Sequence, residues 1–301
     1  MLEFQNIYKS FKNDFWSKQF FALEDVSFMV RRGELVGFLG ANGAGKTTSI
    51  KIILGFIKQN KGRISFAESL GRNKQDILSR IGYFPERPFF YPYLTGREMI
   101  FYTGKLSDVK NADISDRMTY WAKRLQIDHA LERKIRDYSK GMLQRLGLIS
   151  ALIHDPDFLI LDEPLAGLDP LGRKEFKDIL TELNRKGKTI FFSSHIVSDV
   201  EEICKKVIVL ENGKLLYEGS IDSLIKDHIK PGYYFKISSD ININTQNYVR
   251  IVDEREDSKL YEVDALGKMQ FINEMMEKGG ELIEVSQNKP TLEEIIYKIQ
   301  K

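Results

Sequence analysis

The stretch that most restricts the fold is ELVGFLGANGAGKTTSIKIIL, which covers residues 34–54. Its first part is an apolar run that predicts a buried strand, and the residues after Lys46 have the apolar spacing of a helix. Between them lies the glycine-rich turn GANGAGKT. A strand, a turn of the pattern GxxxxGK followed by Ser or Thr, and a helix in this order indicate a phosphate-binding loop. The sequence therefore predicts an anion site where a strand passes into a helix.

Each part of this loop has a task in holding a nucleotide. Glycines let the loop curl so that successive N–H groups point at phosphate oxygens, and the following helix adds its positive N-terminal end. We expect Lys46 to reach the β- and γ-phosphates and the Thr47 hydroxyl to bind Mg²⁺. The residues expected to contact the nucleotide here are Gly40, Ala41, Asn42, Gly43, Ala44, Gly45, Lys46, Thr47 and Thr48.

Two acidic residues, Asp162 and Glu163, follow the apolar run FLIL. In an open α/β sheet, ligands bind at the carboxyl ends of the strands. We therefore expect Asp162 to hold Mg²⁺ through a water and Glu163 to polarise the attacking water. Taken alone, two acids after an apolar strand often mark only the place where the strand reaches solvent. The catalytic interpretation is favoured because the same chain contains a phosphate-binding loop.

His195 ends another apolar run, TIFFSSH. A histidine at this position could contact a γ-phosphate or simply cap the next helix, and in isolation the capping role is favoured. His129, His154 and His228 have no comparable setting, so we expect them to be solvated or structural.

The segment RDYSKGMLQRLGL, residues 136–148, begins like a helix but has an unusual entrance. Ser139 is a good N-cap, and the apolar spacing from Met142 onward is helical. Lys140 and Gly141 follow the cap, where a helix would favour an acid. An entrance that is small, free of acids and rich in backbone N–H groups favours an anion as its partner.

Strands and helices alternate through most of the first two thirds of the chain. Helical patterns follow the strands FLILDEP and TIFFSSH, which indicates a mainly parallel sheet covered on both faces. After Gly219 the pattern changes to a small α+β unit. We therefore expect an α/β fold with domains at 1–219 and 220–301, and a mainly helical part at about 88–152.

The bulk properties exclude several classes of protein. The net charge of +2 and the pI near 8.3 imply no strong attraction to nucleic acid. No apolar run approaches the ~20 residues that a membrane span requires, and residues 1–12 lack the apolar core of a secretory signal. The single cysteine, Cys204, excludes an intramolecular disulfide and fits a reducing compartment. We expect Cys204 to be buried, and the chain to be a cytoplasmic globular protein.

The order of GANGAGKT, YSKGMLQR, LILDEP, AGLD and SSH resembles the ATP-binding subunit of an ATP-binding-cassette (ABC) transporter. The resemblance covers residues 1 to about 220. It implies a P-loop NTPase cassette with a RecA-like core, an N-terminal antiparallel β-subdomain and a helical subdomain, binding ATP and Mg²⁺. It further implies that Asp162 is the Walker B acid, Glu163 the catalytic glutamate, Asp169 the D-loop aspartate and His195 the switch histidine.

The helix entrance at 138–142 corresponds to the family's signature motif, usually Leu-Ser-Gly-Gly-Gln. This chain keeps Ser139 and Gly141 but has Lys140 where the family has glycine. In the family the signature closes over the γ-phosphate held by a partner subunit. The resemblance thus implies that Ser139, Lys140, Gly141 and Asp169 contact nucleotide across a head-to-tail dimer, either a homodimer or a heterodimer with a paralogous ATPase.

Two further positions depart from the family's pattern. Glu86, in IGYFPERP, stands where the family has its Q-loop glutamine. A carboxylate can bind Mg²⁺ but repels a γ-phosphate, so we expect Glu86 near the metal. For the aromatic residue that stacks on adenine, Phe11 is the best match. Phe15, Trp16 and Phe20 in the following loop are alternatives.

The Lys-Gly-Met form of the signature, the Pro-Glu after the strand at 81–84 and the ending PTLEEIIYKIQK resemble the ATPases of ABC-2-type exporters, which carry a C-terminal accessory domain. This implies a peripheral ATPase on the cytoplasmic face of the membrane that drives export through a separate permease, with no role for nucleic acid. The aromatic-rich stretch PFFYPYLTGREMIFY would receive a permease helix, or form only the core of the helical part. The alternatives are a soluble ABC ATPase in DNA repair or translation, and a nucleotide-sensing adaptor.

Overall fold

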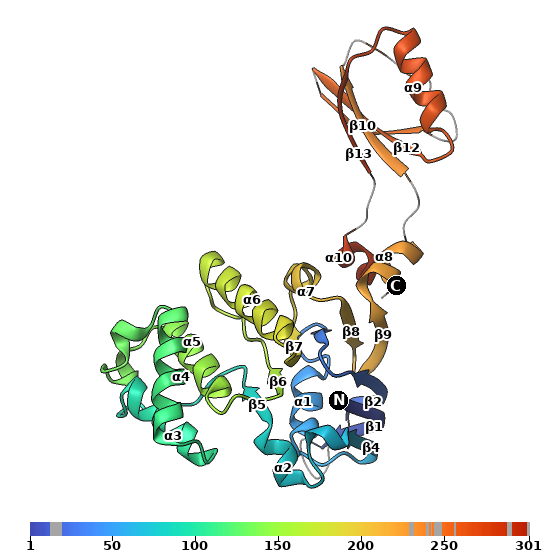
Figure 1. The fold of residues 1–301 in the computed structure, drawn as a ribbon. Helices are drawn as coiled ribbons and strands as arrows, with labels where there is room; N and C mark the ends of the chain where they lie inside the picture. Colours follow the sequence, from blue (N-terminus) through green and yellow to red (C-terminus); the bar gives the residue numbers. More distant parts are fainter. Residues whose placement is uncertain are drawn as a thin grey trace. The chain divides into compact units, whose positions relative to one another are not determined.

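The structure is a computed structural model that describes residues 1–12, 20–228, 232–238, 241, 243, 249–255, 257–287 and 291–299. The chain divides into two compact units, Met1–Ile221 and Asp222–Lys301 (Figure 1). The first unit contains the phosphate-binding loop and the strand ends that carry the candidate acids.

A mainly parallel sheet of six strands among the described residues forms the centre of the first unit. Its strands, in spatial order, are β5 (Ile81–Phe84), β6 (Phe158–Leu161), β7 (Thr189–Ser194), β3 (Leu35–Leu39), β8 (Lys206–Glu211) and β9 (Lys214–Ser220). Only the β8–β9 pair is antiparallel. All residues of β3, β6 and β7 are buried, because parallel strands of this kind are covered on both faces. The predicted α/β fold class is confirmed.

A smaller antiparallel sheet packs beside the central one. It consists of β2 (Phe20–Val30), β1 (Leu2–Phe11) and β4 (Lys61–Phe66) in that order. Phe28 stacks on Phe4 with ring centroids 4.6 Å apart and lies 5.8 Å from Phe191 of β7. These rings join the two sheets into one apolar core. Strand β1 and strand β3, which leads into the loop at Gly40, therefore share one packed core.

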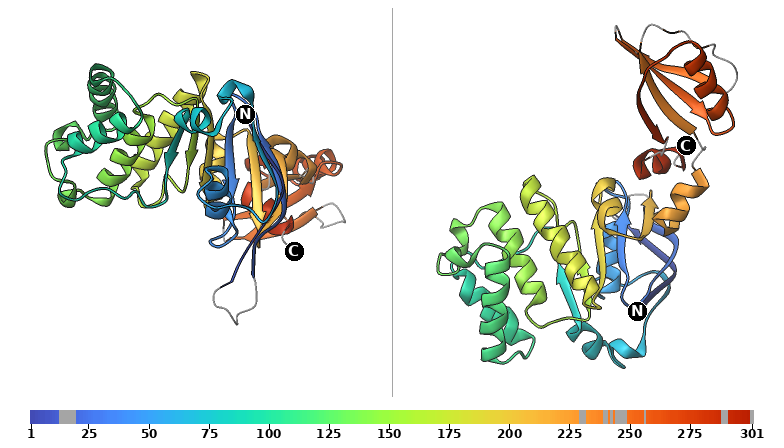
Figure 2. Two further views of the ribbon diagram at one scale, coloured as in Figure 1. Left: turned by 90° about the horizontal axis from the view of Figure 1, so that it is seen from below. Right: turned by 45° about the horizontal axis from the view of Figure 1, so that its top comes forward.

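Helices cover the central sheet and extend beyond one of its edges. Those around the sheet are α1 (Lys46–Ile53), α2 (Lys74–Ser79), α6 (Pro170–Arg185) and α7 (Val197–Ile203), with a 3₁₀ turn at Glu68–Leu70. Three more gather beside β5: α3 (Gly96–Leu106), α4 (Asn111–Arg124) and α5 (Lys140–Leu152), with 3₁₀ turns at Asp128–Ala130 and Ile135–Asp137 (Figure 2). Helix α5 thus joins the expected signature motif to the strand that precedes Glu86.

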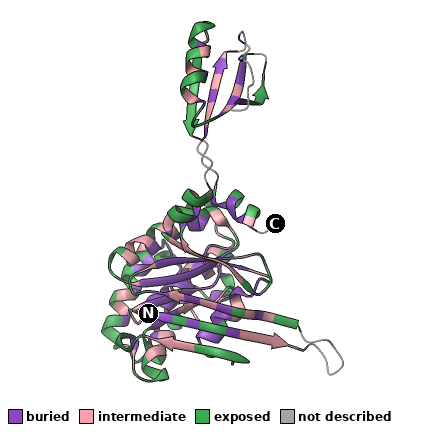
Figure 3. Cartoon of the chain, turned by 90° about the vertical axis from the view of Figure 1, so that its right-hand side faces the viewer, coloured by how far each residue is buried: buried purple, intermediate pink, exposed green. Residues whose placement is uncertain are grey.

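The second unit contains an antiparallel sheet with one helix packed on it. Its elements are α8 (Ile221–His228, which begins at the last residue of the first unit), β10 (Gly232–Ser238), β11 (Val249–Glu254), β12 (Ser258–Asp264), α9 (Lys268–Glu277), β13 (Leu282–Gln287) and α10 (Leu292–Ile299). The described strands have the order β11-β12-β10-β13. Phe271 of α9 packs 4.8 Å from Phe235 and 5.3 Å from Tyr261, so α9 and the central strands share a core of their own (Figure 3).

Among the described residues, no helix combines the length and the apolar character that a membrane crossing requires.

Candidate active site

The loop after β3 has the backbone conformation of a phosphate cradle. Gly43 and Gly45 have φ values of +84° and +107°, in the region that favours glycine. A Cβ on Gly45 would lie 2.7 Å from the backbone oxygen of Ala22, and one on Gly40 would lie 2.6 Å from that of Leu210. Helix α1 begins without a side-chain cap, so its first N–H groups remain available to an anion. The loop therefore has the shape and the donors that a phosphate group needs.

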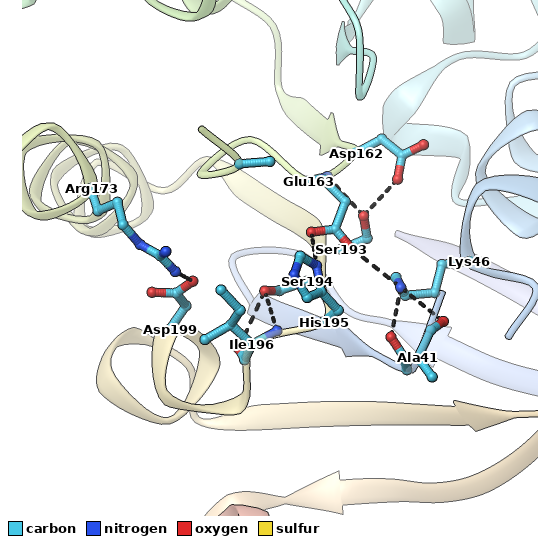
Figure 4. A network of polar contacts seen from close by, with 12 residues as sticks. Ala41, Lys46, Asp162, Glu163, Arg173, Ser193, Ser194, His195, Ile196 and Asp199 are labelled. Atoms are coloured by element: carbon cyan, nitrogen blue, oxygen red, sulfur yellow. Dashed lines mark hydrogen bonds and ion pairs between the residues drawn. The ribbon is translucent and has the colours of Figure 1, made fainter. Parts of the chain in front are cut away.

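The Lys46 side chain folds back along this loop and is only 6% exposed. Its Nζ donates to the carbonyl oxygens of Gly40 at 2.6 Å and Ala41 at 3.3 Å. Nζ also lies 3.2 Å from Oε1 of Glu163, and the two side chains form an ion pair (Figure 4). A buried ammonium requires such partners, because desolvation would otherwise make the charge costly.

Glu163 follows β6 and stands between two other candidate residues. Its Oε2 accepts a hydrogen bond from Nδ1 of His195 at 2.8 Å, while Oε1 pairs with Lys46 (Figure 4). Because a carboxylate only accepts, Nδ1 of the ring carries the proton in this bond. The backbone φ of Glu163 is +49°, an uncommon value outside glycine. The structure thus brings Lys46, Glu163 and His195 into one connected row.

Asp162 is 1% exposed, and its two carboxylate oxygens have different surroundings. Oδ1 accepts from the Ser193 hydroxyl at 2.6 Å, whereas Oδ2 is buried and has no hydrogen-bond partner in the described part of the chain. Burial raises the pKa of Asp162, and the charges of Glu86 and Glu163 raise it further. The hydroxyls of Ser193 and Thr47 oppose that rise by favouring the ionised form.

These groups satisfy what a magnesium ion would require. The free buried oxygen of Asp162 and the neighbouring Thr47 hydroxyl are hard oxygen ligands. No group of three or more His, Cys, Asp or Glu side chains in the described ranges could hold a metal by itself. Mg²⁺ commonly takes one or two protein oxygens and completes its shell with phosphate oxygens and water. The donor set therefore fits a magnesium ion that arrives with a nucleotide.

A cavity of about 540 Å³ opens over the loop. It is lined by Phe11, Phe20, Phe21, Ala22, Ala41, Asn42, Gly43, Gly45, Lys46, Thr47, Thr48, Glu86, Glu163, Ala166 and His195. Gly40, Ala44 and Asp162 are not among the described lining residues. Ala44, within the loop, and Asp162, after β6, are buried. The described lining therefore unites most of the residues expected to hold a nucleotide.

Aromatic rings occupy the end of the cavity formed by β1 and β2. The Phe11 and Phe20 ring centroids are 5.8 Å apart, and the Lys9 ammonium lies 4.9 Å from the centre of the Phe11 ring. Phe20 and Phe21 are both about half exposed. Phe21 belongs to no sequence motif and was not expected at this site, and Phe15 and Trp16 lie outside the described residues. Phe11, Phe20 and Phe21 are the described rings available to an adenine.

Glu86 lines the same cavity from the segment after β5, and its side chain is exposed. Its charge acts on two neighbours. It helps to raise the pKa of Asp162, and it contributes, after burial and Asp162, to a pKa of about 12 for Tyr83. Glu86 therefore lies within electrostatic range of the Asp162 carboxylate and lines the same cavity as Thr47.

Four residues that were expected to contact nucleotide do not belong to the described lining of the cavity. They are Ser139, Lys140, Gly141 and Asp169. Ser139 is the N-cap of α5, as predicted, and accepts from the Met142 N–H at 3.3 Å. Asp169 caps α6 by accepting from the N–H of Gly172 at 3.1 Å. Within this chain the two residues act as helix caps.

Lys140 makes a contact that the sequence motif did not predict. A Cβ on Gly167 would lie 2.3 Å from Cε of Lys140, so the lysine stem covers the glycine. One turn later, Gln144 donates to the carbonyl oxygen of Ala166 at 3.3 Å. Ala166 lines the cavity, and helix α5 therefore contacts the loop at 166–169 of its own chain.

Comparisons with known proteins agree with this geometry. A protein-family model described as "ABC transporter" matches residues 23–166. An uncharacterized ABC transporter ATP-binding protein of Synechocystis is 40% identical over 75% of this chain and 64% of its own length, so the chain spans less than two thirds of that relative. The bacitracin transport ATP-binding protein BcrA of Bacillus licheniformis is 34% identical over 92% of each chain.

A solved structure shows the same fold for the first unit. It is described as the dimeric post-hydrolysis state of an ATP-binding cassette bound to ADP and Pi. Its TM-score is 0.66, with 22% identity over 73% of this chain and 99% of that one. At that identity the likeness shows the fold alone.

Proposed function

Because the chain belongs to the ABC transporter family of ATP-binding proteins, we propose that it binds and hydrolyses ATP with Mg²⁺ and powers export of an unidentified substrate through a separate membrane permease. The observation that carries this proposal is the row Lys46–Glu163–His195 along the phosphate-binding loop. It combines a phosphate ligand, a candidate base and a histidine that orients the base.

Different residues around the cavity bind different parts of the nucleotide. The N–H groups of the loop and Lys46 hold the phosphates, and the aromatic rings at the far end receive the adenine. Thr47, Asp162 and Glu86 would hold Mg²⁺, which would stabilise the negative charge of the phosphates. The fit rests on the buried, unpartnered Oδ2 of Asp162.

Hydrolysis requires the carboxylate of Glu163 to face a water. In this structure its Oε1 faces Lys46 at 3.2 Å instead. An incoming γ-phosphate competes for the same ammonium, so binding would release Oε1 to accept a proton from the attacking water. The water oxygen then bonds to the γ-phosphorus as the bond to the bridging oxygen of ADP breaks. His195 already holds the other carboxylate oxygen in this structure.

The entrance of helix α5 completes the site from a second subunit in this proposal. Ser139 and Lys140 are exposed and contribute nothing to the described cavity of their own chain. Free N–H groups at a helix start attract an anion. A head-to-tail partner would bring its own phosphates to them, and either an identical chain or a paralogous ATPase could serve. The dimeric cassette described above has the same fold.

An exposed aromatic cluster after Glu86 supports a permease partner. Phe89 is 82% and Tyr93 75% exposed, and Tyr91 packs edge-on against both Phe89 and Tyr102. Large rings left in water mark an interaction surface. We propose that a short cytoplasmic helix of the permease packs there, which would hold the ATPase at the cytoplasmic face of the membrane.

Substitution of the candidate base tests the proposed activity. Glu163→Gln keeps the shape of the side chain and the phosphate cradle, so ATP binding should persist while turnover falls at least about 100-fold. Both are measured on the purified full chain, by nucleotide binding and by phosphate release. Turnover of the folded variant near that of the wild type would remove Glu163 from catalysis and overturn the proposed mechanism.

A further inference from the structure

Ser193 lies next to both acids of the site. We propose that Ser193 is a positioning residue: its hydroxyl fixes Asp162 and Glu163 as one unit and thereby sets the Mg²⁺ dependence of nucleotide binding. This inference rests on the proposed ATPase function and assigns a role within that same site.

Ser193 uses its hydroxyl both as a donor and as an acceptor. Its Oγ donates to Oδ1 of Asp162 at 2.6 Å and accepts from the backbone N–H of Glu163 at 2.9 Å. The residue is fully buried, so no water competes for these bonds. Strands β6 and β7 are parallel with Leu161 opposite Phe192, and this register brings Ser193 beside Asp162. Figure 4 shows the hydroxyl between the two acids.

The bond to Asp162 makes its two carboxylate oxygens inequivalent. Oδ1 is held by Ser193, so the carboxylate cannot turn freely, and Oδ2 is left as the oxygen for the metal site. Partners of a ligating carboxylate orient it in this way in metal sites generally. Loss of the hydroxyl would leave Oδ1 free to rotate toward other donors.

The bond to Glu163 acts on its backbone. A φ of +49° is uncommon for a residue with a side chain and persists where surrounding contacts hold it. The Ser193 hydroxyl supplies such a contact at the N–H of Glu163. The carboxylate of Glu163 reaches Lys46 and His195 from this conformation. One hydroxyl therefore positions a metal ligand and a base together.

The next residue along the strand makes separate contacts. The Ser194 hydroxyl accepts from the N–H of Ile196 at 3.0 Å and donates to the carbonyl oxygen of Ile196 at 3.2 Å. It closes the turn that carries His195. Adjacent hydroxyls thus hold different parts of the site, and the proposal concerns Ser193 alone.

Three substitutions separate the hydroxyl from the volume that it fills. Ser193→Ala removes the hydroxyl, Ser193→Cys restores most of the volume with a weak donor, and Ser193→Thr restores the hydroxyl. Thr189→Val is the matched control. Thr189 is also fully buried on β7, and its hydroxyl accepts from the Gly33 N–H at 2.9 Å, at the opposite end of the strand.

The measurement is ADP affinity of the purified full chain, with Mg²⁺ titrated in and with Mg²⁺ removed by chelation. In Ser193→Ala and Ser193→Cys, the Mg²⁺ concentration for half-maximal tightening should rise about 10-fold. Metal-free ADP affinity should stay unchanged, because the phosphate loop is intact. Ser193→Thr should approach the wild type, and Thr189→Val should match it in Mg²⁺ dependence. The rate of ATP hydrolysis should follow the same order.

Several results would overturn the role of Ser193. A Cys variant that behaves as wild type would show that volume matters and the hydroxyl does not. An equal shift in Thr189→Val would show a general loss of strand stability. The Ala and Cys variants decide the matter even if the extra methyl group of threonine prevents folding. Failure of the proposed function would look different, since the wild type itself would then show no Mg²⁺-dependent nucleotide binding.

Discussion

The acids beside the phosphate-binding loop and the entrance of helix α5 are both proposed to contact nucleotide, yet they differ in burial and bonding. Lys46, Asp162 and Glu163 are each less than a tenth exposed and bond to one another or to Ser193 and His195. Ser139 and Lys140 are exposed. One half of the proposed composite site is assembled within a single chain, and the other half is open to a partner.

The difference has a physical cause. A buried charge needs a partner at all times, because an unpaired ion in a low-dielectric interior is strongly unfavourable. The catalytic half must therefore be organised before nucleotide arrives. The N–H groups at an exposed helix start can bond to water instead, so nothing forces that half to close within its own chain. The comparison predicts that substitutions in the two halves fail in different ways.

The largest difference is expected between Lys46→Ala and Ser139→Arg. Lys46→Ala removes the cation that faces the phosphates, so ATP affinity of the dilute, monomeric chain should fall about 10- to 100-fold. Ser139→Arg should leave that affinity unchanged, because the serine lies outside the described cavity. It should still abolish hydrolysis, since a bulky side chain at the helix entrance keeps the dimer from closing.

Thermal unfolding of both variants without nucleotide is the control, because Lys46→Ala also leaves Glu163 without its ion pair. A mixed dimer of the two variants should regain some activity, since one composite site carries both defects and the other carries neither. If Ser139→Arg weakens ATP binding by the monomer as much as Lys46→Ala does, the head-to-tail arrangement is wrong.

A smaller effect is expected at Glu86, which is in the cavity but exposed. Glu86→Gln should leave nucleotide affinity nearly unchanged and raise the Mg²⁺ concentration for half-maximal turnover. Water screens an exposed carboxylate, so we expect a shift of roughly fivefold. ATPase activity titrated against Mg²⁺ would measure it. If the curve superimposes on that of the wild type, Glu86 does not bind the metal. Its role would then be in coupling with the permease.

The smallest effect is expected at Lys140, whose stem covers Gly167 of its own chain. Lys140→Met keeps that stem and should keep turnover, whereas Lys140→Gly uncovers the loop and should reduce turnover roughly twofold, as for a change of about 0.5 kcal/mol at a surface position. ATP affinity of the monomer should not change in either variant. An equal loss of turnover in both variants would show that the charge of Lys140 matters and its stem does not.

Much of the first unit could be predicted from local sequence patterns. The apolar runs at 35–39, 158–161 and 189–194 are strands, because residues buried on both faces of a parallel sheet are uniformly apolar. The expected cap at Ser139 is confirmed. Helix α2 was missed, since it has six residues and none of them is buried, so it shows no apolar periodicity.

The features of the site that could not be predicted depend on contacts between residues far apart in the sequence. Ser193 and Asp162 are 31 residues apart, and only the pairing of β6 with β7 brings them together. The contact of Lys140 with Gly167 likewise joins a helix to a loop that follows another strand. Phe21 was missed as a cavity residue because it belongs to no recognisable motif. Ala166 was missed because only the aspartate of the AGLD motif was expected to contact nucleotide. Such pairs follow from strand order, which local patterns do not encode.

The buried thiol of Cys204 makes the native chain a convenient background for chemical cross-linking. It is the only cysteine, it is 7% exposed, and burial raises its pKa well above its usual range. A thiolate is the reactive form, so Cys204 should resist maleimides and oxidants in the folded protein. Cysteines introduced at Ser139 and at Asn42, which are both exposed, would then react alone. A disulfide between them in separate chains would trap the proposed dimer in its closed form and report which faces meet.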